Sequence, residues 1–220
     1  MFQKITKLFR KTKFNSKDYW ESRYKQGGNS GCGSYGRLAE FKAQVLNEFV
    51  AENNLSSVIE FGCGDGNQLA LANYPKYIGL DVSATIIRKN IEKFANDNTK
   101  SFFLYDQNCF KDNGDVFLSD VALSLDVLYH LIEENVYQNY IIHLFACAKR
   151  FVIIYGTDND IERTSMHSHE FYRKFTRDIN MLAPQWELFH SIENKFKPEG
   201  FPSEEYTSTA GFYFYRRKSH

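Results

Sequence analysis

The sequence predicts an α/β domain built on a doubly wound, mostly parallel sheet with helices on both faces. Apolar runs rich in β-branched and aromatic residues alternate along the chain with segments whose apolar residues follow a helical period. The first of these runs, Val58–Phe61, enters a glycine-rich loop, and the acid Asp81 ends the next run roughly 20 residues later. Ligands of doubly wound sheets bind at the carboxyl ends of such strands, so the same pattern predicts a binding site.

Length and composition favour a single domain. The chain has 220 residues, of which 43% are hydrophobic, and its formal net charge is zero. This charge gives no reason to expect a nucleic-acid partner. The four cysteines form no C-x-x-C pair, which favours a reducing cytoplasm without a disulfide framework or zinc site. The sequence has no apolar stretch of about 18 residues, so we expect no membrane-spanning helix.

The glycine loop is the most informative stretch, and it reads Val58-Ile-Glu-Phe-Gly-Cys-Gly-Asp-Gly66. Glycines allow the backbone to turn sharply and a ligand to approach closely. We expect a helix over 67–73 whose first N–H groups point toward that ligand. Asp81, at the tip of the next strand, can bind ribose hydroxyls. Together these features predict a nucleoside site.

The loop differs from a dinucleotide site. The fingerprint G-x-G-x-x-G requires glycine where this chain has Asn67, and no tyrosine has a lysine four residues later, which weakens an NAD hypothesis. Carboxylates in the strand and loop would repel a pyrophosphate but suit a ligand with a cationic end. The pattern E-x-G-C-G-x-G followed by I-G-L-D resembles motif I and the next strand of class I methyltransferases that use S-adenosylmethionine (SAM). The resemblance implies a seven-stranded Rossmann-like sheet, SAM as cofactor with S-adenosylhomocysteine (SAH) as product, and cofactor contacts from Glu60, Gly62, Gly64, Asp65 and Asp81.

The N-terminal region differs from the rest, and we divide the chain into 1–37 and a methyltransferase domain, 38–220. Residues 1–17 carry six basic side chains and no acid. We expect this arm to be a helix packed on the domain or a solvated tail. Peripheral contact with an anionic membrane is the alternative.

Residues 18–37 combine aromatic side chains with a loop that contains five glycines. We expect Asp18 to cap a short helix. The pattern Y-W-E-x-R-Y…S-G-x-G-S-x-G-R resembles a bacterial methyltransferase subset associated with capsule, O-antigen and other surface-glycan synthesis. That resemblance implies a lid over SAM, with contacts from Tyr19, Trp20, Arg23 and Ser34. A surface loop with an aromatic anchor is the alternative.

The remaining elements alternate without a linker. We expect helices over 38–53, 83–94 and 133–148, strands over 101–105, 121–125 and 151–155, and a closing antiparallel pair over 186–192 and 210–215. Polar residues follow the strand ends. The resemblance implies that Asp106, with Gln107, meets adenine, and that Asp126, Tyr129 and His130 form motif IV beside the transferred methyl group.

The run His169–Thr176 resembles a further feature of the surface-glycan subset. His169 and Arg173 would share a helix face, and an arginine in a cleft suits an anionic acceptor. His167 and His169 could bind a metal, but no third ligand is evident, so we expect no metal.

These observations predict a SAM-dependent O-methyltransferase that acts on a small polar, anionic acceptor in surface-glycan synthesis. The acceptor would be a sugar, a nucleotide-linked sugar or a phosphate-type group. His130 is the first candidate for the base and His169 the second, because the pKa of histidine lies near working pH. Either histidine could instead belong to the scaffold. An N- or C-methyltransferase and a non-catalytic SAM- or SAH-binding subunit remain alternatives.

Overall fold

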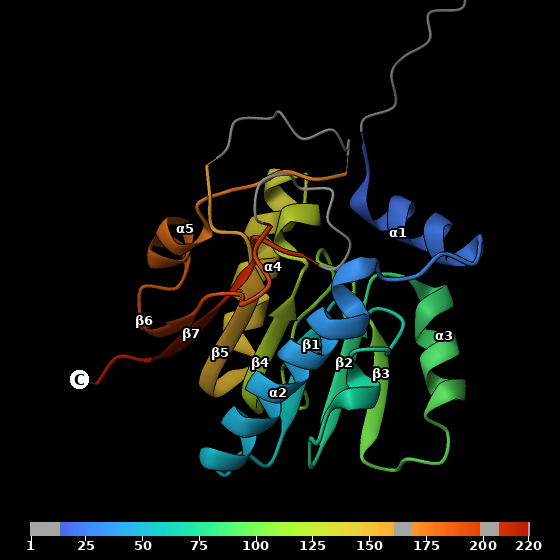
Figure 1. The fold of residues 1–220 in the computed structure, drawn as a ribbon, viewed down its shortest axis with the longest axis horizontal. Helices are drawn as coiled ribbons and strands as arrows, with labels where there is room; N and C mark the ends of the chain where they lie inside the picture. Colours follow the sequence, from blue (N-terminus) through green and yellow to red (C-terminus); the bar gives the residue numbers. More distant parts are fainter. Residues whose placement is uncertain (1–13, 161–168, 199–206, 220) are drawn as a thin grey trace, which may run out of the picture.

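The computed structural model describes residues 14–160, 169–198 and 207–219. Within them, a seven-stranded sheet has the order β3-β2-β1-β4-β5-β7-β6 (Figure 1). The strands are β1 (Val58–Phe61), β2 (Tyr77–Asp81), β3 (Lys100–Leu104), β4 (Ser119–Leu125), β5 (Ala148–Gly156), β6 (Trp186–Ile192) and β7 (Gly211–Arg217). Strands β1 to β5 pair in parallel, and β7 is antiparallel to β5 and β6. The predicted doubly wound sheet is confirmed.

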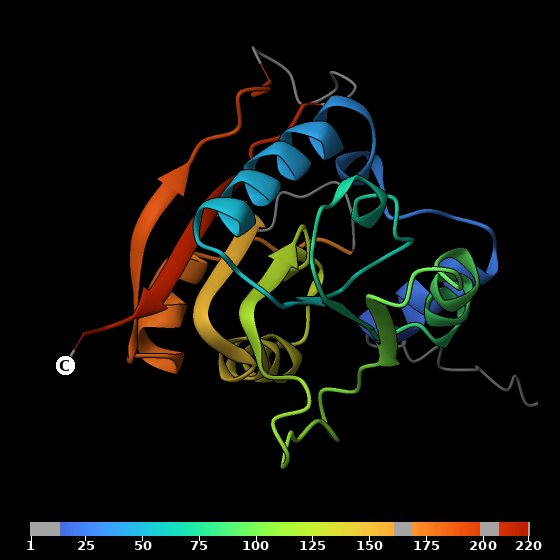
Figure 2. The same cartoon turned by 90° about the horizontal axis from the view of Figure 1, so that it is seen from below.

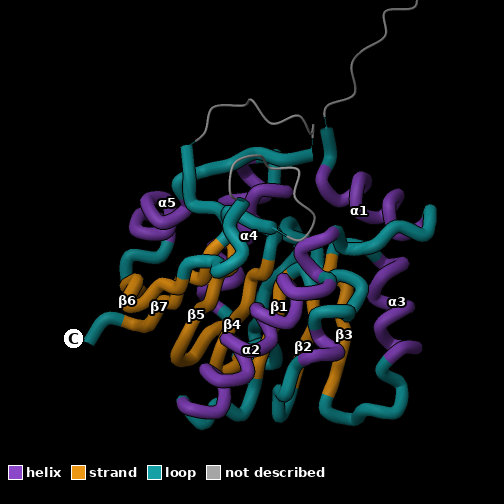
Figure 3. Tube along the Cα trace, in the orientation of Figure 1, coloured by secondary structure: helices purple, strands orange, loops and turns teal. Residues whose placement is uncertain are grey.

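Helices cover both faces of this sheet (Figures 2 and 3). Helices α2 (Gly36–Glu52) and α3 (Ala84–Lys93) pack on one face, where the core includes Leu46 and Ile87. Helices α4 (Glu134–Ala146) and α5 (Phe175–Leu182) pack on the other, with Ile141 and Ile179 in the core. Because both faces are covered, β1 and β2 are buried at every position. None of the described helices is long and apolar enough to cross a membrane.

Helix α1 (Ser16–Lys25) lies at the carboxyl end of the sheet rather than on a face (Figure 1). Its N-cap is Asn15, whose side chain accepts a hydrogen bond from the backbone N–H of Asp18 at 2.9 Å. The prediction that Asp18 caps this helix is therefore wrong by three positions. Asp18 instead falls in the first turn, where its charge interacts favourably with the helix dipole.

The structure contradicts two further helix predictions. After the glycine loop, the helix expected over 67–73 is only a 3₁₀ turn, Leu69–Leu71. Pro75 disfavours helical backbone only at Tyr74, so it limits where such a helix could end but does not prevent one over 67–73. The N–H of Asn73 donates to the Asn47 side chain at 2.8 Å instead of to a helical carbonyl.

The segment from His169 to Arg173 is also not helical. Its backbone groups bond to other segments: Phe171 N–H donates to the Tyr129 carbonyl at 2.7 Å, and the Arg173 carbonyl accepts from Asn159 N–H at 3.2 Å. These bonds replace an i to i−4 ladder, so α5 begins only at Phe175. His169 and Arg173 therefore do not share a helix face. Residues 1–13 of the predicted arm (1–17) and His167 lie outside the described residues.

Candidate functional site

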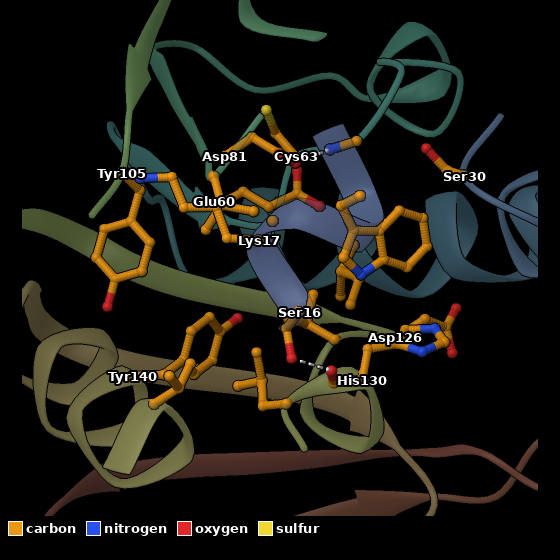
Figure 4. A pocket seen from close by; sticks show the side chains of 18 of the residues that line it. Ser16, Lys17, Ser30, Glu60, Cys63, Asp81, Tyr105, Asp126, His130 and Tyr140 are labelled. Atoms are coloured by element: carbon orange, nitrogen blue, oxygen red, sulfur yellow. Dashed lines mark hydrogen bonds between the residues drawn. The ribbon is translucent and has the colours of Figure 1, made fainter. Parts of the chain in front are cut away.

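A pocket runs along the carboxyl ends of β1 to β4, beneath α1 (Figure 4). It is lined by the glycine loop, the residues that follow β2, β3 and β4, and parts of α1 and α2. The sequence-predicted residues among its lining are Trp20, Ser34, Glu60, Gly62, Gly64, Asp65, Asp81, Asp106, Gln107, Asp126 and His130. The fold thus brings together most of the side chains that the sequence singled out.

Asp81 connects the end of β2 to the glycine loop. Its Oδ2 accepts the N–H of Gly64 at 3.0 Å, and its Oδ1 accepts the N–H of Ser83 at 2.9 Å. Burial raises the pKa of Asp81 to about 6, and these two amide hydrogen bonds act in the opposite direction. Gly64 has φ +56°, and a Cβ there would lie 2.4 Å from the Ser30 hydroxyl, so this position requires glycine.

Glu60 contributes a second buried carboxylate to the pocket. It is 4% exposed and accepts a hydrogen bond from the Tyr77 hydroxyl at 2.6 Å. Burial raises the pKa of Glu60 to about 7, although the Tyr77 hydrogen bond and the charge of Lys42 lower it. A cationic ligand group would stabilise this carboxylate in its ionised form.

Carboxylates hold the 18–37 segment and α1 onto the ends of the strands. Asp65 of the glycine loop accepts from Ser30 N–H and from the Tyr35 hydroxyl, both at 2.8 Å. Lys17 at the start of α1 pairs with Asp106 after β3 at 3.0 Å. The hydrogen bond from Asn108 and the Lys17 ammonium lower the pKa of Asp106. The segment is thereby attached above β1 and β3.

Two more contacts attach α1 above β2 and β4. Glu21 of α1 accepts from the hydroxyls of Ser83 and Thr85 at 2.5 and 2.8 Å, and the Ser83 hydrogen bond lowers the pKa of Glu21 to about 2. Ser16 donates its backbone N–H to Glu133 at 2.9 Å and its hydroxyl to the same carboxylate. Residues 14–35 therefore contact the ends of all four strands that form the pocket.

Asp126, at the end of β4, has φ +59°, a strained conformation for a residue other than glycine. Its Oδ2 pairs with Lys42 of α2 at 2.8 Å, and its Oδ1 accepts from the Tyr129 hydroxyl at 3.2 Å. A Cβ at Gly33 would lie 2.8 Å from Oδ2, so the 18–37 segment fits closely over this carboxylate. The surroundings hold Asp126 in one orientation at the pocket wall.

The two candidate bases lie together. His130 Nδ1 is 3.1 Å from the His169 carbonyl, and the two rings stack with centroids 5.4 Å apart. A carbonyl only accepts, so Nδ1 carries the proton and Nε2 keeps a lone pair. Burial lowers the pKa of His130 to about 4, while the hydrogen bond to His169 raises it. His130 is therefore neutral near pH 7, and Trp20 packs against it edge-on at 5.0 Å.

Four other predicted site residues do not line the pocket but lie beside it: Tyr19, Arg23, Tyr129 and His169. Tyr19 stacks on His169 at 4.8 Å. Arg23 donates Nε–H to the Asn29 carbonyl at 2.7 Å. Tyr129 donates its hydroxyl to Asp126 and packs its ring on His130, with ring centroids 4.3 Å apart. His169 accepts the His130 hydrogen bond through its backbone carbonyl and stacks its ring on His130, so these four residues support the residues that line the pocket.

Arg173 does not point into the pocket beneath α1. Its guanidinium donates to the carbonyls of Leu131 and Ile132 at 2.8 and 3.2 Å and lies over the rings of Tyr137 and Phe171, at 4.2 Å from each centroid. The side chain is 9% exposed. Arg173 lines a second cleft together with Glu134 and Arg177, outside the pocket beneath α1, so its predicted role in binding an anionic acceptor stays a prediction.

Lys42, Gln68 and Tyr140 are among the polar pocket-lining residues that sequence reasoning missed. Lys42 lies four positions after Leu38 and four before Leu46, so it falls on the apolar face of α2. A lysine on the apolar face of a helix is visible in the sequence, so Lys42 could have been identified as a candidate site residue. The Tyr140 hydroxyl donates to the Phe61 carbonyl at 2.9 Å, which no sequence pattern indicated.

The fold and pocket define a doubly wound α/β protein with a ligand site at the carboxyl edge of its sheet. Residues 35–200 match the family model of the methyltransferase domain, so the chain belongs to this family. A curated relative, a small RNA 2'-O-methyltransferase of Arabidopsis thaliana, is 25% identical over 174 residues, which cover 73% of this chain and 18% of the relative. The chain thus spans less than a fifth of that relative's length.

Solved structures share the fold. Magnesium protoporphyrin IX methyltransferase (ChlM) from Synechocystis PCC 6803 with bound SAH superposes with a TM-score of 0.65 and 16% identity, covering 92% of this chain and 98% of that one. The N-methyltransferase NodS from Bradyrhizobium japonicum WM9 in complex with SAH superposes with a TM-score of 0.65 and 15% identity. The match covers 94% of this chain and 100% of the NodS chain. The methyltransferase domain of bacterial CtHen1-C superposes with a TM-score of 0.60 and 20% identity. The match covers 81% of this chain and 97% of that domain.

Proposed function

We propose that the protein is a SAM-dependent methyltransferase whose cofactor binds in the pocket beneath α1. Membership of the methyltransferase family supports the reaction class. The observation that carries the cofactor assignment is a single pocket lined by Gly62, Gly64, Glu60 and Asp81 at the carboxyl ends of β1 and β2. SAM carries a sulfonium and an ammonium, which suit this acidic lining. The ChlM and NodS structures contain SAH in the same fold.

The described residues fit the parts of this cofactor. Each oxygen of Asp81 accepts one backbone hydrogen bond and retains a second lone pair for a ribose hydroxyl. Apolar groups from Val82, Leu131 and Val136 line the same pocket as Asp106 and Gln107. That combination of apolar surface and polar edge suits a purine base.

His130 is the residue we assign as the base. When bound, SAM supplies an electrophilic methyl group in line with its leaving sulfur. The hydrogen bond to the His169 carbonyl holds the His130 ring with its Nε2 lone pair free, so Nε2 can accept the proton of an acceptor hydroxyl. The pKa of about 4 keeps Nε2 unprotonated near neutral pH, but it also makes this nitrogen a weaker base than an ordinary histidine.

We propose a small polar hydroxyl as acceptor, in capsule or other surface-glycan synthesis. The support is the resemblance of the 19–37 pattern and of the His169–Thr176 run to that methyltransferase subset. Arg173 lies outside the pocket beneath α1, so it gives no direct support for an anionic acceptor in that pocket. The Arabidopsis relative favours a second candidate, an RNA 2'-hydroxyl. Methyl transfer to nitrogen or carbon, and cofactor binding without catalysis, are the hypotheses against which a hydroxyl acceptor is tested.

Incubation with methyl-labelled SAM and a panel of sugars, nucleotide-linked sugars, amines and short RNAs tests this proposal. Label should appear on one hydroxyl acceptor, and His130→Gln should lower the rate roughly 10²–10⁴-fold if His130 is a general base. His190→Gln, on the exposed side of β6, is the matched control and should retain full rate. Full turnover by His130→Gln between about pH 6 and pH 9 would rule out base catalysis by this residue.

SAM binding without transfer to any acceptor would favour a non-catalytic SAM-binding subunit. Label on an amine or on carbon would replace the oxygen assignment while leaving the cofactor assignment intact. Label on RNA would select the second candidate.

A further inference from the structure

The imidazole of His130 is stacked against rings from two segments that are far from it in the sequence. The ring of His169 stacks on it with centroids 5.4 Å apart and 16° between the planes. Tyr19 of α1 in turn stacks on His169, with centroids 4.8 Å apart and 13° between the planes. Each neighbouring pair is nearly parallel, so the three rings connect α1 to the loop that follows β4.

These stacked rings supply an orientation that the hydrogen bond of His130 does not supply alone. The bond from Nδ1 to the His169 carbonyl selects the tautomer of the imidazole. The χ2 torsion of histidine has a broad energy profile, so one hydrogen bond leaves the tilt of the ring free. Trp20 and Tyr129 also pack on this imidazole, with centroids at 5.0 and 4.3 Å. The neighbouring rings therefore fix the plane of His130.

Helix α1 is anchored on both sides of Tyr19. Before it, the backbone N–H of Ser16 donates to the carboxylate of Glu133 at 2.9 Å. After it, Glu21 accepts from the hydroxyl of Ser83 at 2.5 Å. These two contacts hold α1 over the carboxyl ends of the strands and keep the Tyr19 ring in place. One support of the candidate base therefore comes from the helix that covers the pocket.

We propose that Tyr19 and His169 are positioning residues, whose stacked rings hold His130 in the orientation in which Nε2 accepts the proton of an acceptor hydroxyl. The inference rests on the proposed function, because the orientation of this ring affects turnover only if His130 is the base. It gives His169 a role other than that of a base: its carbonyl selects the tautomer of His130, and its ring fixes the plane. It also makes the orientation of the base depend on the seating of α1.

Nitrogen NMR of the histidine rings tests the positioning in the full-length protein without requiring an acceptor. The His130 signals are identified as those lost in His130→Gln. Near neutral pH, the wild-type protein and Tyr19→Phe, which keeps the stacked ring, should show His130 as one neutral tautomer with its proton on Nδ1. Tyr19→Ala should show a mixture of tautomers, because the ring is free to turn. Phe189→Ala, at a half-buried position of β6 outside the pocket, is the matched control and should resemble the wild-type protein.

Turnover of methyl-labelled SAM with the hydroxyl acceptor that the panel identifies gives a second readout. Tyr19→Ala should lower kcat roughly 10- to 100-fold, because a misplaced base transfers the proton poorly. Its KM for SAM should stay within about threefold of the wild-type value, since Tyr19 does not line the pocket. Tyr19→Phe and His169→Phe keep a ring at each position and should retain kcat within about threefold.

The possible results separate positioning from other roles. A single Nδ1–H tautomer in Tyr19→Ala overturns the positioning role whether or not an acceptor is known. Weaker SAM binding with an unchanged kcat means that Tyr19 only covers the cofactor, and it overturns the proposal as well. Loss of turnover in His169→Phe returns His169 to the role of base. Full turnover by His130→Gln overturns the proposed base, and the positioning role with it, even where the NMR result is as expected. Tyr19→Leu replaces Tyr19→Ala if thermal melting shows that the alanine variant is unfolded.

Discussion

Replacing Glu60 with glutamine tests whether burial in the pocket beneath α1 raises the pKa of this carboxyl group. Burial raises the pKa of this carboxyl group from 4.5 to about 7, against the opposing effects of the Tyr77 hydroxyl and the Lys42 ammonium. Since the folded-state pKa lies above the unfolded value, the folded protein holds this proton more tightly. The stability that Glu60 contributes is therefore fully present below about pH 4.5 and is lost as the pH rises through about 7.

The size of this effect follows from the difference between the two pKa values. A change from 4.5 to about 7 corresponds to about 3 kcal/mol, most of which falls between about pH 5 and pH 8. Urea denaturation of the wild-type and Glu60→Gln proteins at these two pH values measures it. Between these pH values, the free energy of unfolding should fall by about 2–3 kcal/mol less in Glu60→Gln than in the wild-type protein. The reason is that glutamine resembles the protonated acid and does not titrate.

Glu52→Gln, at an exposed position of α2, is the matched control and should keep the wild-type pH dependence. Other groups that titrate independently of Glu60 contribute equally to the pH-dependent change in both proteins. Their contribution therefore cancels when the change in the variant is subtracted from the change in the wild-type protein. Identical pH dependence in the wild-type and Glu60→Gln proteins would refute the reasoning. It would mean that Lys42 and Tyr77 outweigh burial and that Glu60 is ionised throughout this range.

Three further predictions concern the cofactor, the 18–37 segment and Arg173. Asp81→Ala should weaken SAM binding by roughly 1–3 kcal/mol in calorimetry, because ribose hydroxyls lose a buried partner, and unchanged affinity would contradict the assignment. Added SAH should slow proteolysis between Gly27 and Gly33, whereas equal cleavage rates would reject a lid. Arg173→Ala should lower the free energy of unfolding by roughly 1–3 kcal/mol, because buried carbonyls lose their donor. Native stability with a raised acceptor KM would instead restore its role in substrate binding.

The fold was predictable because its signals are local. Strand and helix periods, the glycines of the loop and the acid at the end of β2 each constrain a short segment, and their order determines a doubly wound sheet. The meeting of Glu60, Asp106 and Asp126 in one pocket was predictable from this sheet, because the carboxyl ends of parallel strands lie at one edge.

The direction of individual side chains was not predictable in the same way. Arg173 and Lys42 are both buried basic residues that follow an aromatic residue in the sequence, yet one bonds to carbonyls outside the pocket and the other lines it. Spacing does not encode that difference. It depends on where the carbonyls of Leu131 and Ile132 come to lie, which follows from tertiary packing. The absence of the helix expected at 67–73 was equally unpredictable from spacing, because the Asn73 N–H bonds to Asn47 of α2, which is a tertiary contact.

The charges of the pocket connect these findings. Glu60 and Asp81 are buried with raised pKa values, which shows that the surroundings alone do not stabilise both carboxylates in their ionised form. Lys42 offsets part of this charge but is engaged by Asp126. A ligand that brings a sulfonium and an ammonium would stabilise the two acids in their ionised form. Such a ligand therefore suits the electrostatics of the pocket, whereas a pyrophosphate would add negative charge beside carboxylates that already repel one another.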